Sequence, residues 1–209
     1  MQRSVDAIVF DMDGTLLDSH EIVISAYRDT VADPALSDAA VLAAFPAGPP
    51  AAVLARLLGR AATAAELRRY HALLADAADR VPVYPGVTDL LAAAGQRAGL
   101  GVFTGASRQA ARILLGFGGL LGYFRVIVGG DEVPAPKPDP SGVLRACQAL
   151  GVHASRVAYV GDSPLDLLAA RRGGALAVAA AWSSPDLGGS AELAHLVAAT
   201  PSDVLSLLE

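Results

Sequence analysis

Two aspartates, Asp11 and Asp13, follow directly after the apolar run Val5–Phe10. In an extended backbone alternate side chains point to the same side, so the two carboxyl groups are expected to lie close together. Neighbouring carboxylates ionise at little cost only where a cation or hydrogen-bond donors stand beside them. The pair therefore predicts either a solvated acidic turn or a site that holds a positively charged partner.

Two further segments carry groups that can bind anions. Thr104 ends the apolar run Leu100–Thr104, and small residues follow it before a helix, an arrangement that aims backbone N–H groups at an anion. Lys137 stands among prolines in the stretch Val133–Pro140, and a stiff loop can hold one ammonium against a phosphate or a group of carboxylates. Taken alone, each segment is also compatible with a helix cap or a solvated loop.

A second acidic stretch follows the apolar run Val157–Val160. Asp162 stands at the tip of that run, before any residue that a helix cap would explain, which makes it a candidate ligand. Ser163 and Pro164 favour the start of a helix. Asp166, three residues after Ser163, is therefore either a helix-capping residue or an acid of the site.

The elements that must position these groups alternate along the chain. Short apolar runs are typical of strands buried on both faces of a parallel sheet, and amphipathic segments separate them. The predicted strands are Val5–Phe10, Leu100–Thr104, Val126–Val128, Val157–Val160 and Leu176–Ala180, and the predicted helices between them are Val87–Ala98, Gln109–Phe117, Gly142–Leu150 and Leu165–Arg172. This alternation predicts an α/β fold with a Rossmann-like open parallel sheet.

One segment contains helical patterns only. We expect residues 18–81 to form a small all-helical cap domain and residues 1–17 plus 82–209 to form the α/β core. Thr63 and Glu66 predict a capping box, and Asp18 is expected to cap the first cap helix. The expected cap helices are Ile22–Val31, Ala39–Phe45, Ala51–Leu58 and Glu66–Arg80. The segment leaves the sheet where the first strand ends, and ligands of open α/β sheets bind at that edge.

Composition excludes several classes of protein. With 53 % hydrophobic and 18 % charged residues, the 209-residue chain is neither disordered nor a coiled coil. The net charge is −5 and no basic run occurs, so we expect no nucleic-acid partner. Apolar stretches such as Ala175–Trp182 are too short to span a membrane, and nothing marks the chain for export. The single cysteine, Cys147, suits a cytoplasmic protein, and we expect a monomer or a homodimer.

Taken together, the candidate groups stand at four successive strand ends, which lie on one edge of a parallel sheet. In this order and spacing the motifs DMDGT, the strand-end Thr104, Lys137 in PKPDP and GDSPLD resemble those of the haloacid dehalogenase superfamily. The resemblance runs from Val5 to beyond Trp182, and it is to the phosphatase branch that carries a helical cap after the first strand. The size and position of the cap resemble those of phosphoglycolate-phosphatase-like members.

The resemblance implies a phosphatase that uses Mg²⁺ and acts on a small phosphorylated metabolite of the phosphoglycolate or sugar-phosphate type. Asp11 would be the nucleophile that forms an aspartyl-phosphate, and Asp13 the general acid and base. The implied metal ligands are Asp11, Asp162 and the backbone carbonyl of Asp13, and Asp166 would either bind the metal as well or lie just behind its ligands. The groups expected around the phosphate are Thr104, Lys137 and the amides of Gly105 and Ala106, and the cap residues expected to contact substrate are His20 and Arg56.

Related activities fit less well. A dehalogenase releases halide, which needs no acid, and would lack Asp13. A phosphonoacetaldehyde hydrolase needs a cap lysine, and none occurs between Ser19 and Val81. Two alternatives stay open: a sugar-phosphate mutase of the β-phosphoglucomutase type, and a phosphate-binding regulator without turnover.

Overall fold

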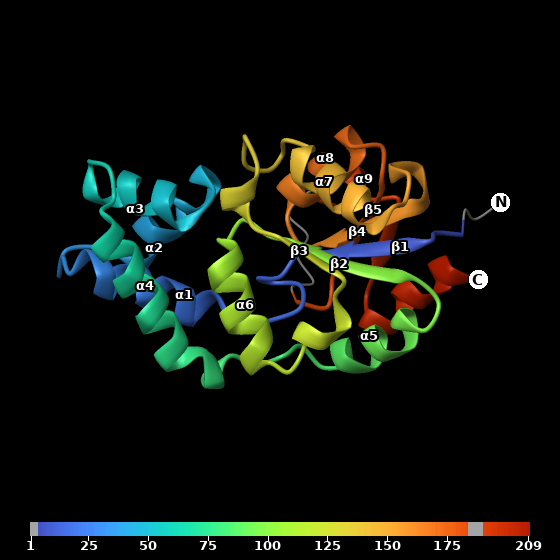
Figure 1. Cartoon of the computed structure of the whole chain (residues 1–209), viewed down its shortest axis with the longest axis horizontal. Coiled ribbons are helices and arrows are strands. Elements are labelled where there is room, and N and C mark those ends of the chain that lie inside the picture. Colours follow the sequence, from blue (N-terminus) through green and yellow to red (C-terminus); the bar gives the residue numbers. More distant parts are fainter. Residues whose placement is uncertain (1–3, 184–189) are drawn as a thin grey trace.

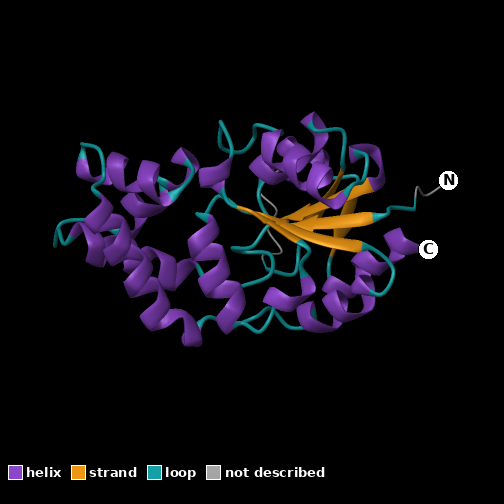
Figure 2. Cartoon of the chain, viewed as in Figure 1, coloured by secondary structure: helices purple, strands orange, loops and turns teal. Residues whose placement is uncertain are grey.

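A parallel sheet forms the centre of the structure (Figures 1 and 2). The computed structural model describes residues 4–183 and 190–209, and within these ranges the sheet has six strands in the order β3-β2-β1-β4-β5-β6. The strands are β1 (Ala7–Phe10), β2 (Gly99–Phe103), β3 (Val126–Val128), β4 (Val157–Gly161), β5 (Leu176–Ala180) and β6 (Leu196–Ala198). The order reverses at β1, so the carboxyl end of β1 is the switch point at which open α/β sheets bind ligands.

Helices cover both faces of the sheet (Figure 1). The helices α5 (Val87–Gly95) and α6 (Arg108–Phe117) and the 3₁₀ helix η6 (Pro201–Leu208) lie on one face, and α7 (Ser141–Leu150) and α8 (Pro164–Arg172) lie on the other. Alternate residues of each strand pack against the helices on opposite faces of the sheet. Ile8 and Phe10 belong to the first hydrophobic cluster, whereas Ala7 and Val9 belong to the second. The α/β class predicted from the sequence is confirmed.

Short elements complete the connections. These are η3 (Leu121–Tyr123), η4 (Gly130–Glu132), η5 (Ala154–Arg156) and α9 (Ser190–Leu193). None of the helices in the described ranges combines the length and the apolar composition needed to cross a lipid bilayer.

The segment between β1 and α5 is helical, and it lies beyond the carboxyl end of β1 (Figure 1, blue to cyan). It contains α1 (His20–Val31), α2 (Asp38–Leu42), η1 (Phe45–Ala47), α3 (Pro50–Leu58), α4 (Ala64–Ala77) and η2 (Ala78–Arg80). Tyr27 of α1 stacks on Tyr70 of α4 with their ring centroids 4.5 Å apart. The predicted capping box of Thr63 and Glu66 is present at the start of α4. The division into two domains at residues 17/18 and 81/82 stays a prediction.

The chain enters and leaves this segment through two adjacent extended stretches. Leu17 pairs with Val83 in an antiparallel bridge, and the Asp18 amide donates to the Pro82 carbonyl at 2.9 Å. This pairing keeps Asp18 outside the helix and exposed. The predicted cap by Asp18 is therefore wrong: the N-cap residue of α1 is Ser19, and the Ser19 side chain makes no capping hydrogen bond.

Helix α7 packs so closely against β2 that one methyl group added between them should lower the stability of the fold. A Cβ on Gly142 would lie 2.1 Å from the Phe103 ring, whereas a Cβ on Gly116 of α6 would meet nothing within 4 Å. We expect Gly142→Ala to lower the free energy of unfolding by about 1 to 3 kcal/mol, the usual cost of overpacking. Gly116→Ala removes a helix-interior glycine and should be neutral or stabilising. Urea unfolding of both variants measures the difference, and equal stabilities would contradict this packing.

Candidate active site

The predicted site residues converge because the strands that carry them end at one level. Phe10 of β1 pairs with Val102 of β2 and with Val160 of β4, so the residues that follow these strands lie at one edge of the sheet. A cavity of about 290 Å³ opens there, between the sheet edge and the helices α1–α4. The predicted residues that line it are Asp11, Asp13, His20, Thr104, Gly105, Ala106, Lys137, Asp162 and Asp166.

Arg56 is the exception. Its side chain is exposed on α3 and does not line the cavity. His20, the other cap residue expected to contact substrate, is part of the lining. Arg56 therefore has no part in the proposed chemistry.

Lys137 lies at the centre of the polar end of the cavity. Its Nζ donates to Asp11 Oδ1 at 2.5 Å and to Asp166 Oδ1 at 2.6 Å, and its side chain is only 10 % exposed. The ammonium also lies 5.0 Å from the centroid of the Phe103 ring and 5.4 Å from that of Tyr159. Aromatic faces attract cations at these distances. The Lys137 ammonium is thus bound by two carboxylates and lies over the rings of Phe103 and Tyr159.

Asp166 caps a helix and also lines the cavity. Its Oδ1 accepts from Lys137 and lies 3.1 Å from the Tyr159 hydroxyl, whose single proton is shared with the Phe103 carbonyl at 2.8 Å. Its Oδ2 accepts from the amide and the hydroxyl of Ser163, at 3.1 Å and 2.5 Å, which forms a capping box at the start of α8. A carboxylate has about four lone-pair sites; Lys137 and the amide and hydroxyl of Ser163 fill three of them, and the Tyr159 hydroxyl lies at the fourth. Asp166 therefore orients Lys137 and begins the helix.

Asp13 is bound by two hydroxyl groups. Ser19 Oγ donates to Asp13 Oδ1, and Thr104 Oγ1 lies 3.5 Å from Asp13 Oδ2. Burial raises the pKa of Asp13, and the hydrogen bond from Ser19 and the nearby His20 offset only part of that rise. Asp13 is consequently a carboxyl group that can carry a proton more readily than an exposed aspartate.

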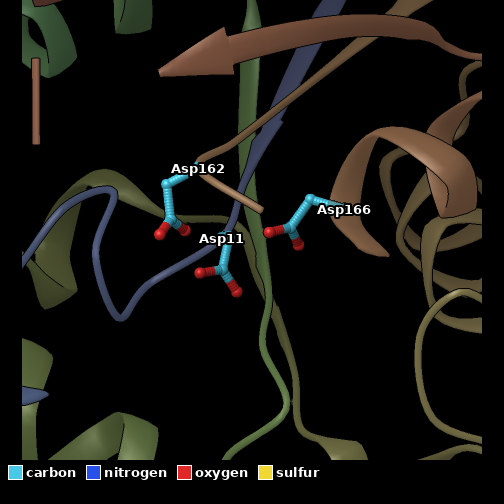
Figure 3. A group of neighbouring side chains, drawn as sticks. All are labelled: Asp11, Asp162 and Asp166. Atoms are coloured by element: carbon cyan, nitrogen blue, oxygen red, sulfur yellow. The ribbon is translucent and has the colours of Figure 1, made fainter. Parts of the chain in front are cut away.

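Three carboxylates point toward one another at the bottom of the cavity (Figure 3). Asp11, Asp162 and Asp166 each bring one oxygen atom into a group whose atoms lie within 4.8 Å of one another. The turn after β1 makes room for Asp162. Gly14 has a φ of +80°, and a Cβ there would lie 2.5 Å from Asp162 Oδ2. A residue with a side chain at position 14 would therefore be strained and would also displace Asp162.

The charges of this group are not balanced by the protein. Among the described residues that line the cavity, Lys137 is the only lysine or arginine beside four aspartates. Burial raises the pKa of Asp11, Lys137 opposes the rise, and neighbouring carboxyl groups add to it. Burial, followed by the charge of Asp166, raises the pKa of Asp162 to about 6. Buried carboxylate oxygens in excess of cations fit a divalent ion of the Mg²⁺ type, which binds oxygen ligands.

The loop after β2 is tied to the core and also to α4. Thr104 Oγ1 accepts from the Ala106 amide at 3.1 Å, so that amide, expected to bind phosphate, is engaged by its own loop. The amide of Gly130 donates to the Ala106 carbonyl at 2.7 Å. Ser107 caps α6 through its hydroxyl, which accepts from the Ala110 amide. These bonds fix the Thr104 hydroxyl beside Asp13.

A family model described as haloacid dehalogenase-like hydrolase matches residues 8–180 of the chain. The chain belongs to the haloacid dehalogenase-like hydrolases. A phosphoglycolate phosphatase of Cupriavidus necator is 36 % identical over 179 residues, which cover 80 % of this chain and 77 % of that protein. A pyrophosphatase, PpaX of Bacillus velezensis, is 29 % identical over 87 % of this chain and 85 % of its own. This hydrolase is an enzyme of the phosphatase type and is phosphoglycolate-phosphatase-like.

A solved structure has the same fold. CbbY from Rhodobacter sphaeroides, in complex with phosphate, superposes with a TM-score of 0.84 at 24 % sequence identity and covers 98 % of this chain and 99 % of its own. The match includes both the sheet and the helical segment, since it spans nearly the whole of both chains.

Two polar residues of this hydrolase escaped the sequence analysis. Ser19 binds Asp13, and Tyr159 binds Asp166 and the Phe103 carbonyl. Tyr159 could have been found from alternation along the predicted strand, because it lies two residues before Gly161, on the side where Asp166 packs. Ser19 carried no such signal, since the preceding Asp18 offered a more typical helix cap.

A hydrogen bond joins the helical segment to the core. His71 Nε2 lies 2.8 Å from Ser107 Oγ, so α4 contacts the residue that begins α6. We expect His71→Ala to raise the KM for p-nitrophenyl phosphate about two- to fivefold with little change in kcat, because one hydrogen bond of about 1 kcal/mol holds the two parts together. His153→Ala is the control, because His153 is exposed and does not line the cavity. An unchanged KM in His71→Ala would contradict this role.

Proposed function

We propose that this hydrolase is a Mg²⁺-dependent phosphatase that cleaves a small phosphomonoester through a phosphorylated Asp11. The observation that carries the proposal is the arrangement around Lys137. One buried ammonium contacts Asp11, whereas the Asp13 carboxyl group is contacted by the hydroxyl groups of Ser19 and Thr104. Two carboxyl groups in different environments are what a nucleophile and a general acid require.

In the first step an oxygen of the Asp11 carboxylate attacks phosphorus in line with the leaving oxygen. The new O–P bond forms as the P–O bond to the substrate alcohol breaks, and Asp13 gives its proton to that alcohol. The Lys137 ammonium and the Thr104 hydroxyl orient the transferring oxygens, and charge neutralisation there lowers the barrier.

In the second step water attacks the phosphorus of the aspartyl-phosphate. Asp13, now ionised, takes a proton from this water, inorganic phosphate leaves, and the Asp11 carboxylate is restored. Ser19 holds the Asp13 carboxyl group in place through both steps. The helical segment excludes bulk water from the cavity, which strengthens the electrostatic interactions inside it.

A divalent ion would be held by Asp11, by the backbone carbonyl of Asp13 and by Asp162. When bound, Mg²⁺ supplies positive charge against the oxygens of the phosphoryl group. The hydrogen bonds from Lys137 and Ser163 to both oxygens of Asp166 favour a role for Asp166 in orienting Lys137, so we assign it no direct bond to the ion.

Hydrolysis is better supported than a mutase reaction. A mutase of the β-phosphoglucomutase type passes through a bisphosphate, whose second phosphate must lie elsewhere in the cavity. Lys137 is already paired with Asp11 and Asp166, and no other lysine or arginine lines the described part of the cavity. We therefore expect no glucose 6-phosphate from β-glucose 1-phosphate and a bisphosphate primer.

The direct test is release of p-nitrophenol from p-nitrophenyl phosphate with Mg²⁺ and with excess chelator. We expect turnover with Mg²⁺ and a loss of at least about 100-fold after chelation, since the uncompensated carboxylates repel the substrate. Absence of turnover under every metal condition would leave the phosphate-binding regulator as the better reading. The cytoplasmic location and the choice between monomer and homodimer stay predictions.

A further inference from the structure

Much of the cavity lining that the helical segment contributes is apolar and aromatic. Tyr27, Phe45 and Tyr70, here called the aromatic wall, all line the cavity. Tyr27 stacks on Tyr70, and its ring centroid lies 5.9 Å from that of Phe45. Aliphatic side chains continue this surface; they are Val23, Leu42, Val53 and Leu114. The part of a substrate that extends away from Lys137 therefore meets rings and methyl groups.

This wall carries no cation, and its polar side-chain atoms are the hydroxyl groups of Tyr27 and Tyr70. Among the described residues that line the cavity, the one ammonium belongs to Lys137, which is bound to Asp11 and Asp166 at the other end. His20 is the remaining basic side chain of the lining. It lies close enough to Asp13 and Asp162 to lower their pKa values, which places it on the side of those carboxyl groups.

We propose that the alcohol released by this enzyme is uncharged and largely apolar, and that the enzyme discriminates against esters whose leaving group carries a carboxylate or a second phosphate. The inference rests on the proposed function. A carboxylate placed against the aromatic wall would lose its hydration without gaining a cation, which is costly. An aromatic or branched aliphatic group would instead be removed from water by surfaces of its own kind.

The size of the cavity suits a small alcohol. A volume of about 290 Å³ lies at the lower end of the range for small-molecule sites, and the phosphate occupies part of it. There is room for one ring or a short branched chain. The name of the relative from Cupriavidus necator refers to phosphoglycolate, the ester of an alcohol with a carboxylate. We expect this chain to prefer a different class of ester.

The test compares two primary phosphate esters, benzyl phosphate and 2-phosphoglycolate, under identical conditions with Mg²⁺. We expect kcat/KM to be at least about tenfold higher for benzyl phosphate, since a single unpaired charge is worth that much or more in a water-poor site. An equal or higher value for 2-phosphoglycolate would overturn the inference while leaving the proposed function intact. If neither ester nor p-nitrophenyl phosphate is hydrolysed, the proposed function fails, and the inference fails with it.

Adding a positive charge to the lining of the cavity should shift the preference toward the ester that carries a carboxylate. Leu42 lines the cavity and Leu144 of α7 does not, yet both side chains are 44 % exposed on helices and tolerate a longer side chain. We expect Leu42→Arg to shift the ratio of the two kcat/KM values at least about tenfold toward 2-phosphoglycolate, because the guanidinium pairs with the carboxylate. Leu144→Arg should leave the ratio unchanged. A ratio that does not move in Leu42→Arg would overturn the inference.

Discussion

Asp11→Asn reduces phosphatase activity by at least about 1,000-fold in our account, because the amide is a poor nucleophile and no other described carboxylate stands in its place. The fold should survive. Burial and neighbouring carboxyl groups raise the pKa of Asp11, so removing its charge relieves repulsion among Asp11, Asp162 and Asp166. The measurement is the rate of p-nitrophenol release, together with the thermal midpoint of unfolding.

A neighbouring acid gives the matched control. Asp18 belongs to the same acidic stretch, but it is exposed and does not line the cavity. Asp18→Asn should therefore keep the activity of the wild type. Asp11→Asn with near-normal activity would rule out Asp11 as the nucleophile, and inactivity of both variants would point to general damage from changes in this turn.

Lys137→Met is expected to have the second large effect, on stability as well as on activity. Methionine keeps most of the side-chain volume but leaves Asp11 and Asp166 without their shared cation. Removing one partner of a buried ion pair costs about 3 to 5 kcal/mol. We expect a loss of that size in the free energy of unfolding without metal, and a fall in kcat/KM of at least about 1,000-fold.

The stability loss in Lys137→Met depends on pH in a defined direction. Lys137 opposes the rise in the pKa of Asp11, so its removal raises that pKa further. A carboxyl group with a higher pKa in the folded state binds more protons there than in the unfolded state, and stability then falls as the pH rises above about 4. The variant should lie closest to the wild type in mild acid and furthest from it above neutrality.

Arg156→Met is the control for the loss of a basic residue. Arg156 pairs with Asp6, but both side chains are about half exposed. Exposed ion pairs contribute little to stability, so we expect urea unfolding of Arg156→Met to resemble that of the wild type across the pH range. Equal behaviour of Lys137→Met and Arg156→Met would contradict the central position given to Lys137.

Much of the fold could be predicted because the buried strands are continuous apolar runs. Ala7–Phe10 and Val157–Gly161 lie where the sequence predicts strands, and each is fully buried. The strand β6 (Leu196–Ala198) was missed, since it is short, lies at the sheet edge and is partly exposed. Such a strand forms because β5 offers hydrogen-bonding groups, a tertiary effect that local pattern does not reveal.

The candidate site could be predicted to the extent that its residues follow strands. Asp11, Thr104 and Asp162 do so, and parallel strands bring such positions to one edge. Residues on helices were harder to place. Arg56 and Leu42 both come from the helical segment, yet Leu42 lines the cavity and Arg56 does not. Which face of α2 and of α3 turns toward the cavity depends on how these helices pack against each other and against α1, and the period of the sequence alone leaves that orientation open.

The formation of a phosphorylated Asp11 is the central claim, and trapping it is the most direct test. Asp13→Asn is suited to this, because p-nitrophenolate leaves without an acid whereas the water step needs Asp13 as a base. We predict that acid quenching of this variant during reaction with p-nitrophenyl phosphate and Mg²⁺ leaves one phosphoryl group on the peptide that contains Asp11, located by mass spectrometry. Phosphate release without any phosphorylated protein, or a phosphoryl group on another residue, would contradict the account.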